Sequence, residues 1–464
     1  MENEPIKNKQ NKYIKDMTKG EPLKLLLGFA IPLLIGNFFQ QAYNLADSII
    51  VGRYVGKISL GAVGATSSIL FFINSLTMGL SVGIGIVVAQ FFGAKEDKEV
   101  KNTIGNGYLI IIITGLIVTI IGFIFSGYIL NILNTPKDTL PFAIIYFKTT
   151  SIGFIPIAFF HLLSSILRAL GDSKTPLLFL ILACIINISL DLIFVIKFNF
   201  GIMGVGIATI FSQFIAAVLC LIYANLNNSY FKLNNKDFKY NKNIFFKIIK
   251  IGFPVACQGS LISFSLIALQ KVVNSFGSDF VTSFTVVTRI ELLVQHPLSS
   301  LGAAVATYTG QNIGAGKLDR VKLGFIRAII CSSSFSFFIF ILFQNFAAKI
   351  VRIFGDDPIV EKNSVIGLKI TCSFYIFLGL IHISRNVLNG AGDTNFCLIN
   401  GLVECIGRVC FAKPLTMIPF LGLNGVWLTT GITWLLNGIF STIRYYQGKW
   451  KNLSFVESNK LSIV

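Results

Sequence analysis

The sequence predicts an all-α polytopic membrane protein, with twelve transmembrane helices forming two six-helix lobes. Three observations lead to this fold class: an apolar composition, twelve long apolar runs and an internal repeat. The chain has 464 residues with a mean hydropathy of +0.74, and only 13% of them are charged, whereas soluble domains carry about 25%. A chain this apolar is expected to lie largely within a lipid bilayer.

Twelve apolar runs are long enough to cross a bilayer as helices, which takes about 20 residues each. The continuous run 110–125 does not alternate between apolar and polar residues, which argues against a membrane β-barrel. The runs lie near 25–50, 60–88, 103–126, 140–167, 176–196, 202–224, 247–274, 281–306, 323–347, 362–389, 396–418 and 423–446.

The two halves of the chain repeat each other at an offset of 221 residues. Because each half has six spans, both copies have the same orientation in the membrane, so we expect a pseudo-two-fold axis along the membrane normal. Transporters built from such repeats bind cargo near the midplane and expose the site to each side in turn. The matches are Gln90/Gln311, His161/His382, Asp172/Asp393 and Gly201/Gly422, with Pro32/Pro254 at 222.

The distribution of charge predicts the topology. Under the positive-inside rule, 26 Lys and Arg on the N-terminal side, against 10 on the other, place both termini in the cytoplasm of a plasma-membrane protein. The net charge of +18 therefore reflects topology and does not indicate nucleic-acid binding. No removed signal peptide is expected. The expected divisions are a cytosolic tail (1–24), an N-lobe (25–225), a cytosolic linker (226–246), a C-lobe (247–446) and a second tail (447–464).

The first apolar run carries a polar face that ends in a carboxylate. At about 100° per residue, six polar positions fall within an arc of roughly 120°. An ionised acid at membrane depth is costly and usually faces a cavity or an ion path, although an acid near a helix end can also reach interfacial water. The positions are Asn37, Gln40, Gln41, Asn44, Asp47 and Ser48.

A second buried acid lies in the fifth span, where Asn187 and Asp191 are four residues apart on one helix face. Together with Asp47 and Thr209 they supply two carboxylates, an amide and a hydroxyl. These hard oxygen ligands suit Na⁺; alternatively, burial and mutual repulsion would make one carboxyl a proton site. A hydrogen-bonded structural contact is the simpler alternative.

The C-terminal half places different charges at the matching positions. Arg408 stands where the N-terminal half has Asn187, and Glu404 lies four residues before it, so the two are expected to pair. A structural clamp and a role in a substrate cavity are equally open. Gln258 is a further cavity candidate, whereas Arg289 and Glu291 point to different sides of their helix and are expected near a helix end or interface.

Several other motifs carry no chemistry. The segment GQNIGAGK at 310–317 resembles a phosphate-binding loop only superficially, because Leu318 stands where Ser or Thr is needed. The three His are expected to be hydrogen-bonded core residues. The eight Cys lie in apolar spans without a C-x-x-C motif, so they are interpreted as small buried hydrophobic residues.

The chain resembles the multidrug and toxic compound extrusion (MATE) family over nearly its whole length. The resemblance rests on IPLLIGNFFQQAYNLADSIIVGRYVG in the first span, QxxGA after spans two and eight, LRALGDSKTP after span four, and GxxGVGIAT opening span six. It implies two six-helix lobes that export cationic amphipathic compounds. It also implies a cation site at Asp47, Asn187, Asp191 and Thr209. Some family members have acids in spans seven and ten, which this chain lacks.

The sequence therefore predicts a secondary active multidrug exporter, not an enzyme, that antiports its cargo against Na⁺ or H⁺ and needs no cofactor. Cavity candidates are the first-span polar face, Gln258, Glu404 and Arg408. A monomer in the bilayer is expected. The main alternative is a flippase of lipid-linked or other amphipathic precursors, and a passive channel or a multi-pass enzyme are weaker ones. The sequence leaves the substrate and the coupling ion open.

Overall fold

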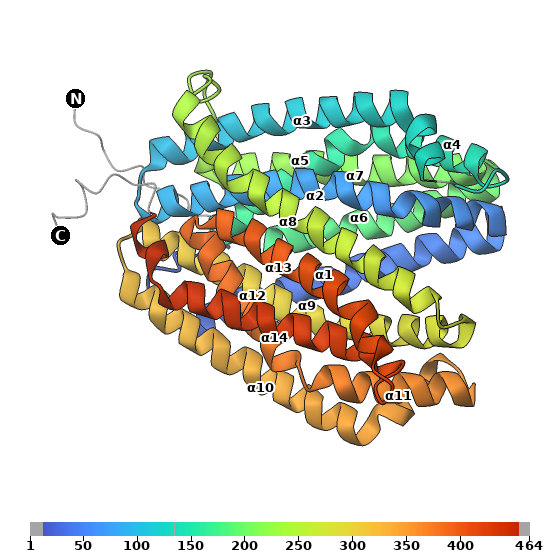
Figure 1. Ribbon diagram of the computed structural model, residues 1–464. Coiled ribbons are helices and arrows are strands. Elements are labelled where there is room, and N and C mark those ends of the chain that lie inside the picture. The colour runs from blue at the N-terminus through green and yellow to red at the C-terminus, as the bar shows by residue number, and fades with distance from the viewer. Residues whose placement is uncertain (1–12, 134, 454–464) are drawn as a thin grey trace, which may run out of the picture. The chain divides into compact units, whose positions relative to one another are not determined.

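A computed structural model describes residues 13–133 and 135–453, and these form helices joined by short loops, with no strand among them (Figure 1). The described chain divides into two compact units. The N-terminal unit holds Pro32–Ala256 and the segment up to Asp16, and the C-terminal unit holds Met17–Ile31 and the chain from Cys257. The division therefore falls inside two helices, α1 and α8, close to Pro32 and Pro254.

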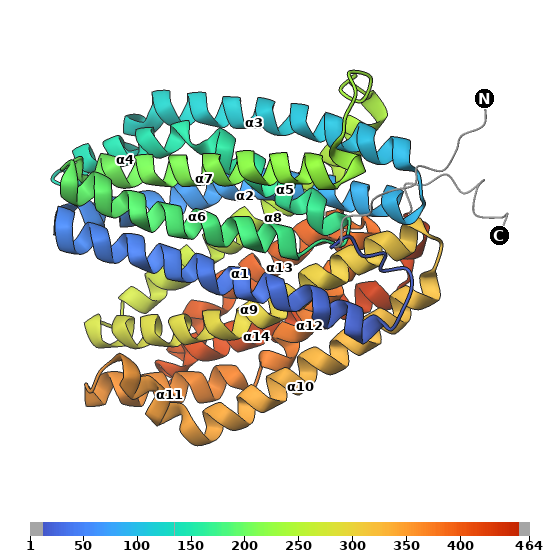
Figure 2. The same cartoon turned by 180° about the vertical axis from the view of Figure 1, so that it is seen from behind.

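The N-terminal unit is a bundle in which α2 packs against α3, α4 and α5, while α7 packs against α4, α5 and α6 (Figure 2). Gly36 of α1 lies against Leu177 and Leu180 of α6, where even a methyl group would touch both leucines. The helices are α1 (Pro22–Ile50), α2 (Lys57–Gly93), α3 (Asp97–Ile132), α4 (Leu140–Ile152), α5 (Phe154–Ala169), α6 (Lys174–Leu192) and α7 (Gly201–Asn227).

The C-terminal unit repeats this packing helix for helix. The six pairs made by α2 and α7 each have a counterpart here: α9 packs against α10, α11 and α12, and α14 packs against α11, α12 and α13. The helices are α8 (Lys242–Asn274), α9 (Ser278–Gly314), α10 (Leu318–Val351), α11 (Pro358–Cys372), α12 (Tyr375–Ala391), α13 (Thr394–Met417) and α14 (Asn424–Tyr446).

The backbone confirms the internal repeat in detail. The fourth span of each half is broken, α4 bending into α5 by 48° and α11 into α12 by 50°. Left-handed residues also recur at the 221-residue offset, because the same tight turns follow the same helices. The pairs are Gly56/Gly277, Lys95/Gly316, Gly171/Gly392 and Gly201/Gly422.

The predicted all-α membrane fold is confirmed. In the described chain nine single helices are long and apolar enough to cross a bilayer, and the two bent pairs bring the number to eleven. The remaining run is α9, which has 37 residues, as its counterpart α2 does. It is less apolar because it carries Arg289, Glu291 and His296, and we count it as a span by its length and its place in the repeat.

Close backbone contact joins α2 to the first half of α8 within the N-terminal unit. A methyl group at Gly83 would lie 2.7 Å from backbone atoms of Gly252, and one at Gly79 would overlap the backbone of Ala256. Small residues four apart let two helices approach in this way. The contact therefore depends on the absence of side chains at these positions.

The segment before α1 is held by the α9–α10 connection of the C-terminal unit. The Met17 N–H donates to Gln311 Oε1 at 2.8 Å, and Arg320 Nη2 donates to the Gly20 carbonyl oxygen at 2.9 Å. Lys317 Nζ donates to the Thr18 carbonyl oxygen at 3.0 Å. The last residues of the predicted cytosolic tail are thus part of the folded structure, while residues 1–12 lie outside the described part.

Candidate cation site

Three helices of the N-terminal unit bring the predicted cation ligands together. Asp47 lies on α1 and Asp191 on α6, and their carboxyl groups are close enough to interact electrostatically. Asn187 lies one turn before Asp191 on the same face of α6. On α7, the Thr209 hydroxyl lies 3.4 Å from the Tyr43 hydroxyl of α1. Residues separated by more than 160 positions therefore form one polar cluster.

The cluster is buried but incomplete in its hydrogen bonds. Asn187 and Asp191 have no solvent-exposed surface, and Asp47 is half-buried. Within the described residues, Asp47 Oδ1, both polar atoms of the Asn187 amide and both oxygens of Asp191 lack a hydrogen-bond partner. Buried polar groups in proteins are normally paired, and an unpaired one calls for a ligand or proton. The orphaned oxygens therefore fit a cation or proton site.

Two tyrosines complete the cluster, and the sequence analysis missed both. Tyr43 precedes Asp47 by four residues on α1, and Tyr146 on α4 is buried and lies within electrostatic range of both carboxyl groups. The spacing of Tyr43 and Asp47 was a usable signal, because residues four apart share a helix face. Tyr146 had no such signal, since only the packing of α4 brings it to the acids.

Both acid-bearing helices end in a π-helical turn immediately after the acids. Val51–Val55 follows α1 and Ile193–Lys197 follows α6. Within each turn an N–H bonds five residues back, as Gly56 N–H does to the Val51 carbonyl oxygen at 3.0 Å. Among the described residues, π turns occur at these two places alone. Such turns are frequent at functional sites, and here they flank a single cluster.

The predicted cavity residues fall into two sets. On α1, Gln40 and Asn44 are exposed and Asn37 and Gln41 are half-buried, all in the N-terminal unit. In the C-terminal unit, Gln258 on α8 is buried and its amide lies 3.5 Å from Asn400 Oδ1 on α13. Whether the two sets line one substrate cavity stays a prediction.

Glu404 and Arg408 form the predicted ion pair inside the C-terminal unit. Arg408 Nη2 lies 2.8 Å from Glu404 Oε1, and both side chains are at most 8% exposed. Of the two alternatives for Glu291, a position near a helix end is wrong, because it lies in the interior of α9 and is 6% exposed. It lies instead where α9 meets Thr371 of α11 and Tyr375 of α12.

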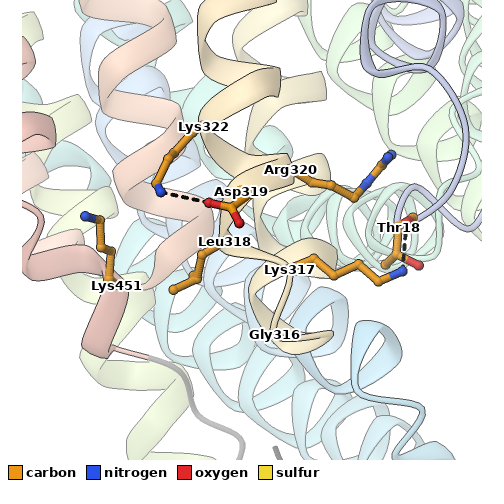
Figure 3. A pocket seen from close by; sticks show the side chains of 8 residues that line it. All are labelled: Thr18, Gly316, Lys317, Leu318, Asp319, Arg320, Lys322 and Lys451. Carbon is orange, nitrogen blue, oxygen red and sulfur yellow. Dashed lines mark hydrogen bonds and ion pairs between the residues drawn. The ribbon is translucent and has the colours of Figure 1, made fainter. Parts of the chain in front are cut away.

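A separate basic pocket lies at the α9–α10 connection of the C-terminal unit (Figure 3). Its volume is about 610 Å³, and Lys317, Arg320, Lys322 and Lys451 line it together with Asp319. Lys322 pairs with Asp319 at 2.8 Å. This excess of positive charge is unsuited to a cationic ligand, so the pocket is not the site where cationic cargo would bind.

Two repeated helical units that span a membrane, with unpaired acids buried in one of them, define a membrane transport protein. The MatE family model matches residues 32–193 and 254–411, and the chain belongs to this family.

Comparisons with individual proteins agree over nearly the whole chain. The probable multidrug resistance protein YpnP of Bacillus subtilis is 30% identical over 439 residues, covering 94% of this chain and 97% of the relative. The probable multidrug resistance protein NorM of Thermotoga maritima is 26% identical over 446 residues, 95% of each chain. The fold is similar to a solved MOP superfamily transporter from Pyrococcus furiosus, with a TM-score of 0.89 at 24% identity over 97% of this chain and 100% of that one.

Proposed function

We propose that this protein is a secondary active multidrug exporter that antiports cationic amphipathic compounds against Na⁺ or H⁺ by alternating access. The buried, unpaired set of Asp47, Asn187 and Asp191 carries the proposal. Family membership and the multidrug names of the relatives support the kind of cargo. The protein would act as a monomer in the plasma membrane with both termini in the cytoplasm.

Cation binding supplies the coupling step in this proposal. Two buried carboxylates beside each other repel, so taking up a proton or Na⁺ lowers the electrostatic cost of the site. Asp47 is on α1 and Asp191 on α6, so neutralising them changes how tightly α1 packs on α6. We infer that this change favours release of the cargo to the outside.

The substrate would lie against the polar face of α1, near Gln40, Gln41 and Asn44, with aromatic side chains supplying apolar contact. Glu404 and Arg408, which form a buried ion pair, are proposed as further residues that contact the cargo. A cationic cargo and the coupling ion are attracted by the same negative charge, so they should compete.

The test is efflux of a fluorescent cationic dye from proteoliposomes under a Na⁺ gradient or a pH gradient, imposed separately. Asp47→Asn keeps the size of the side chain but removes its charge. Asp138→Asn, in the loop before α4, is the matched control because this carboxylate lies outside the spans.

We expect one gradient to drive efflux in the wild type and in Asp138→Asn, and at least a tenfold loss in Asp47→Asn. The gradient that works identifies the coupling ion. Dye flux that ignores both gradients and Asp47 would refute the antiport proposal and favour a flippase of amphipathic precursors.

A further inference from the structure

The C-terminal unit buries three charged side chains within one cluster. Glu291 on α9 and Glu404 and Arg408 on α13 are 6%, 6% and 5% exposed. Two acids and one base leave an excess negative charge if all three ionise. Since a buried charge without a partner is costly, the first question is which acid the arginine neutralises.

Arg408 forms its ion pair with Glu404. Its Nη2 lies 2.8 Å from Glu404 Oε1, and its Nη1 donates to Ser265 Oγ at 2.7 Å. The other oxygen of Glu404 accepts from Asn437 Nδ2 at 3.4 Å. Both carboxylate oxygens of Glu404 are therefore occupied, and this half of the cluster is electrically neutral.

Glu291 is left without an ion-pair partner. It lies within electrostatic range of Arg408, but across residues 13–133 and 135–453 the arginine makes its ion pair with Glu404 alone. The neighbouring groups are Thr371 on α11 and Tyr375 on α12, with Cys372 beside them. The Thr371 hydroxyl lies near both the Glu291 carboxyl and the Tyr375 hydroxyl. In the described structure, however, Glu291 Oε1 and the two hydroxyl groups make no hydrogen bond of good geometry.

We propose that the C-terminal unit binds one proton at the Glu291 carboxyl. A buried carboxylate that finds no counter-charge neutralises itself by taking up a proton. The acid form has an O–H to donate and a carbonyl oxygen to accept, which suits two unsatisfied hydroxyl groups. A Na⁺ ion fits less well, because hard cations need several oxygen ligands and the Arg408 guanidinium repels a second cation.

This site differs from the cluster of the N-terminal unit and does not depend on its proposed role. At the 221-residue offset, Glu291 corresponds to Leu70 and Arg408 to Asn187. The C-terminal unit therefore has an arginine where the N-terminal unit has the amide side chain of Asn187. Its proton site lies on a different helix and would titrate independently of Asp47 and Asp191.

The test measures the carboxylic-acid C=O stretch by infrared spectroscopy of the full-length protein in lipid nanodiscs at neutral pH. The background variant Asp47→Asn/Asp191→Asn removes the acids of the N-terminal cluster. Glu291→Gln is then added to this background, and the difference spectrum isolates the signal of one side chain. Because transport is not measured, failure of the antiport proposal leaves this test unaffected.

We expect Glu291→Gln to remove one protonated carboxyl per protein molecule. A difference spectrum without such a band overturns the proposal. If Glu291→Gln does not fold, Glu404→Gln replaces it, because it frees Arg408 to pair with Glu291 and drive off the proton. Loss of the same band then supports the proposal, and its persistence overturns it.

Discussion

The buried pair of Arg408 and Glu404 shows how one residue can set the charge of a whole cluster. The ion pair measures 2.8 Å. Arg408 also donates to Ser265 Oγ on α8, and Glu404 accepts from Asn437 Nδ2 on α14, so three helices hold the two side chains in one geometry. Removing one member of a buried pair leaves an uncompensated charge, which is usually far more damaging than removing an exposed one.

Arg408→Met should therefore destabilise the protein by about 3–5 kcal/mol, because it leaves the Glu404 carboxylate buried without its counter-charge. Glu404→Gln should cost clearly less, because Arg408 can then pair with Glu291. Thermal unfolding in detergent compares the two. Lys322→Met, which breaks an exposed ion pair with Asp319, serves as the control. Equal losses of stability in Arg408→Met and Glu404→Gln would contradict this assignment of charges in the cluster.

Lys95 has a left-handed backbone, with φ of 61°, at the turn where the other half has Gly316 at 71°. A side chain in this conformation costs roughly 1–2 kcal/mol relative to glycine, partly offset by the greater freedom of glycine in the unfolded chain. Lys95→Gly should thus raise the unfolding temperature slightly, and Gly316→Lys should lower it. Opposite shifts in thermal unfolding are the expected result, and a stabilising Gly316→Lys would refute it.

At the scale of elements, α2 and α8 pack backbone against backbone within the N-terminal unit. Gly83 of α2 faces Gly252 of α8, so the two backbones touch where most helix pairs are separated by side chains. Close approach of this kind increases the van der Waals contact between helices in a membrane.

Gly83→Ala should destabilise the N-terminal unit by about 1–3 kcal/mol, because the added methyl group forces α2 and α8 apart. Gly64→Ala in the same helix is the matched control, since a methyl group there meets nothing within 4 Å. The control should be neutral or stabilising by helix propensity. Thermal unfolding of both variants is measured in the same detergent. Equal stability of the two would show that the α2–α8 contact tolerates an added methyl group.

For the whole molecule, the topology is still a prediction from the charge distribution. Under the positive-inside rule, the 226–246 segment faces the cytoplasm and the α3–α4 loop faces outward. In a variant with all eight cysteines replaced, the thiol introduced by Asp138→Cys should react with a membrane-impermeant thiol reagent in intact cells. The thiol introduced by Asn234→Cys should react only after the cells are lysed. The opposite pattern would invert the topology.

The fold could be predicted from the sequence because its apolar runs are long and recur at a fixed offset. Apolar runs and the 221-residue repeat located each long helix or bent helix pair to within eight residues at its ends, since bilayer thickness fixes helix length. The breaks at Gly153 and Phe374 were not predicted, because each bent pair reads as one continuous apolar run. The membership of Met17–Ile31 in the C-terminal unit was not predicted either, as it depends on contacts with residues nearly 300 positions away.

Part of the candidate site could also be predicted from the sequence. Asp47, Asn187 and Asp191 stood out because charged and amide groups are rare in spans. Tyr146 and the isolation of Glu291 could not be found this way. Both depend on which helices pack together, and that information lies in the tertiary structure.

The π turn after α1 has a further meaning in the history of the chain. Pro32 and Gly56 are separated by 24 positions, whereas their counterparts Pro254 and Gly277 are separated by 23. A π turn fits one additional residue into a helix, so the first half has gained a residue, or the second half has lost one, since the duplication. The extra residue changes the rotational register of α1 relative to everything that follows it. A difference of one codon in length, rather than any substitution, thus changes the structure of α1 relative to its counterpart α8.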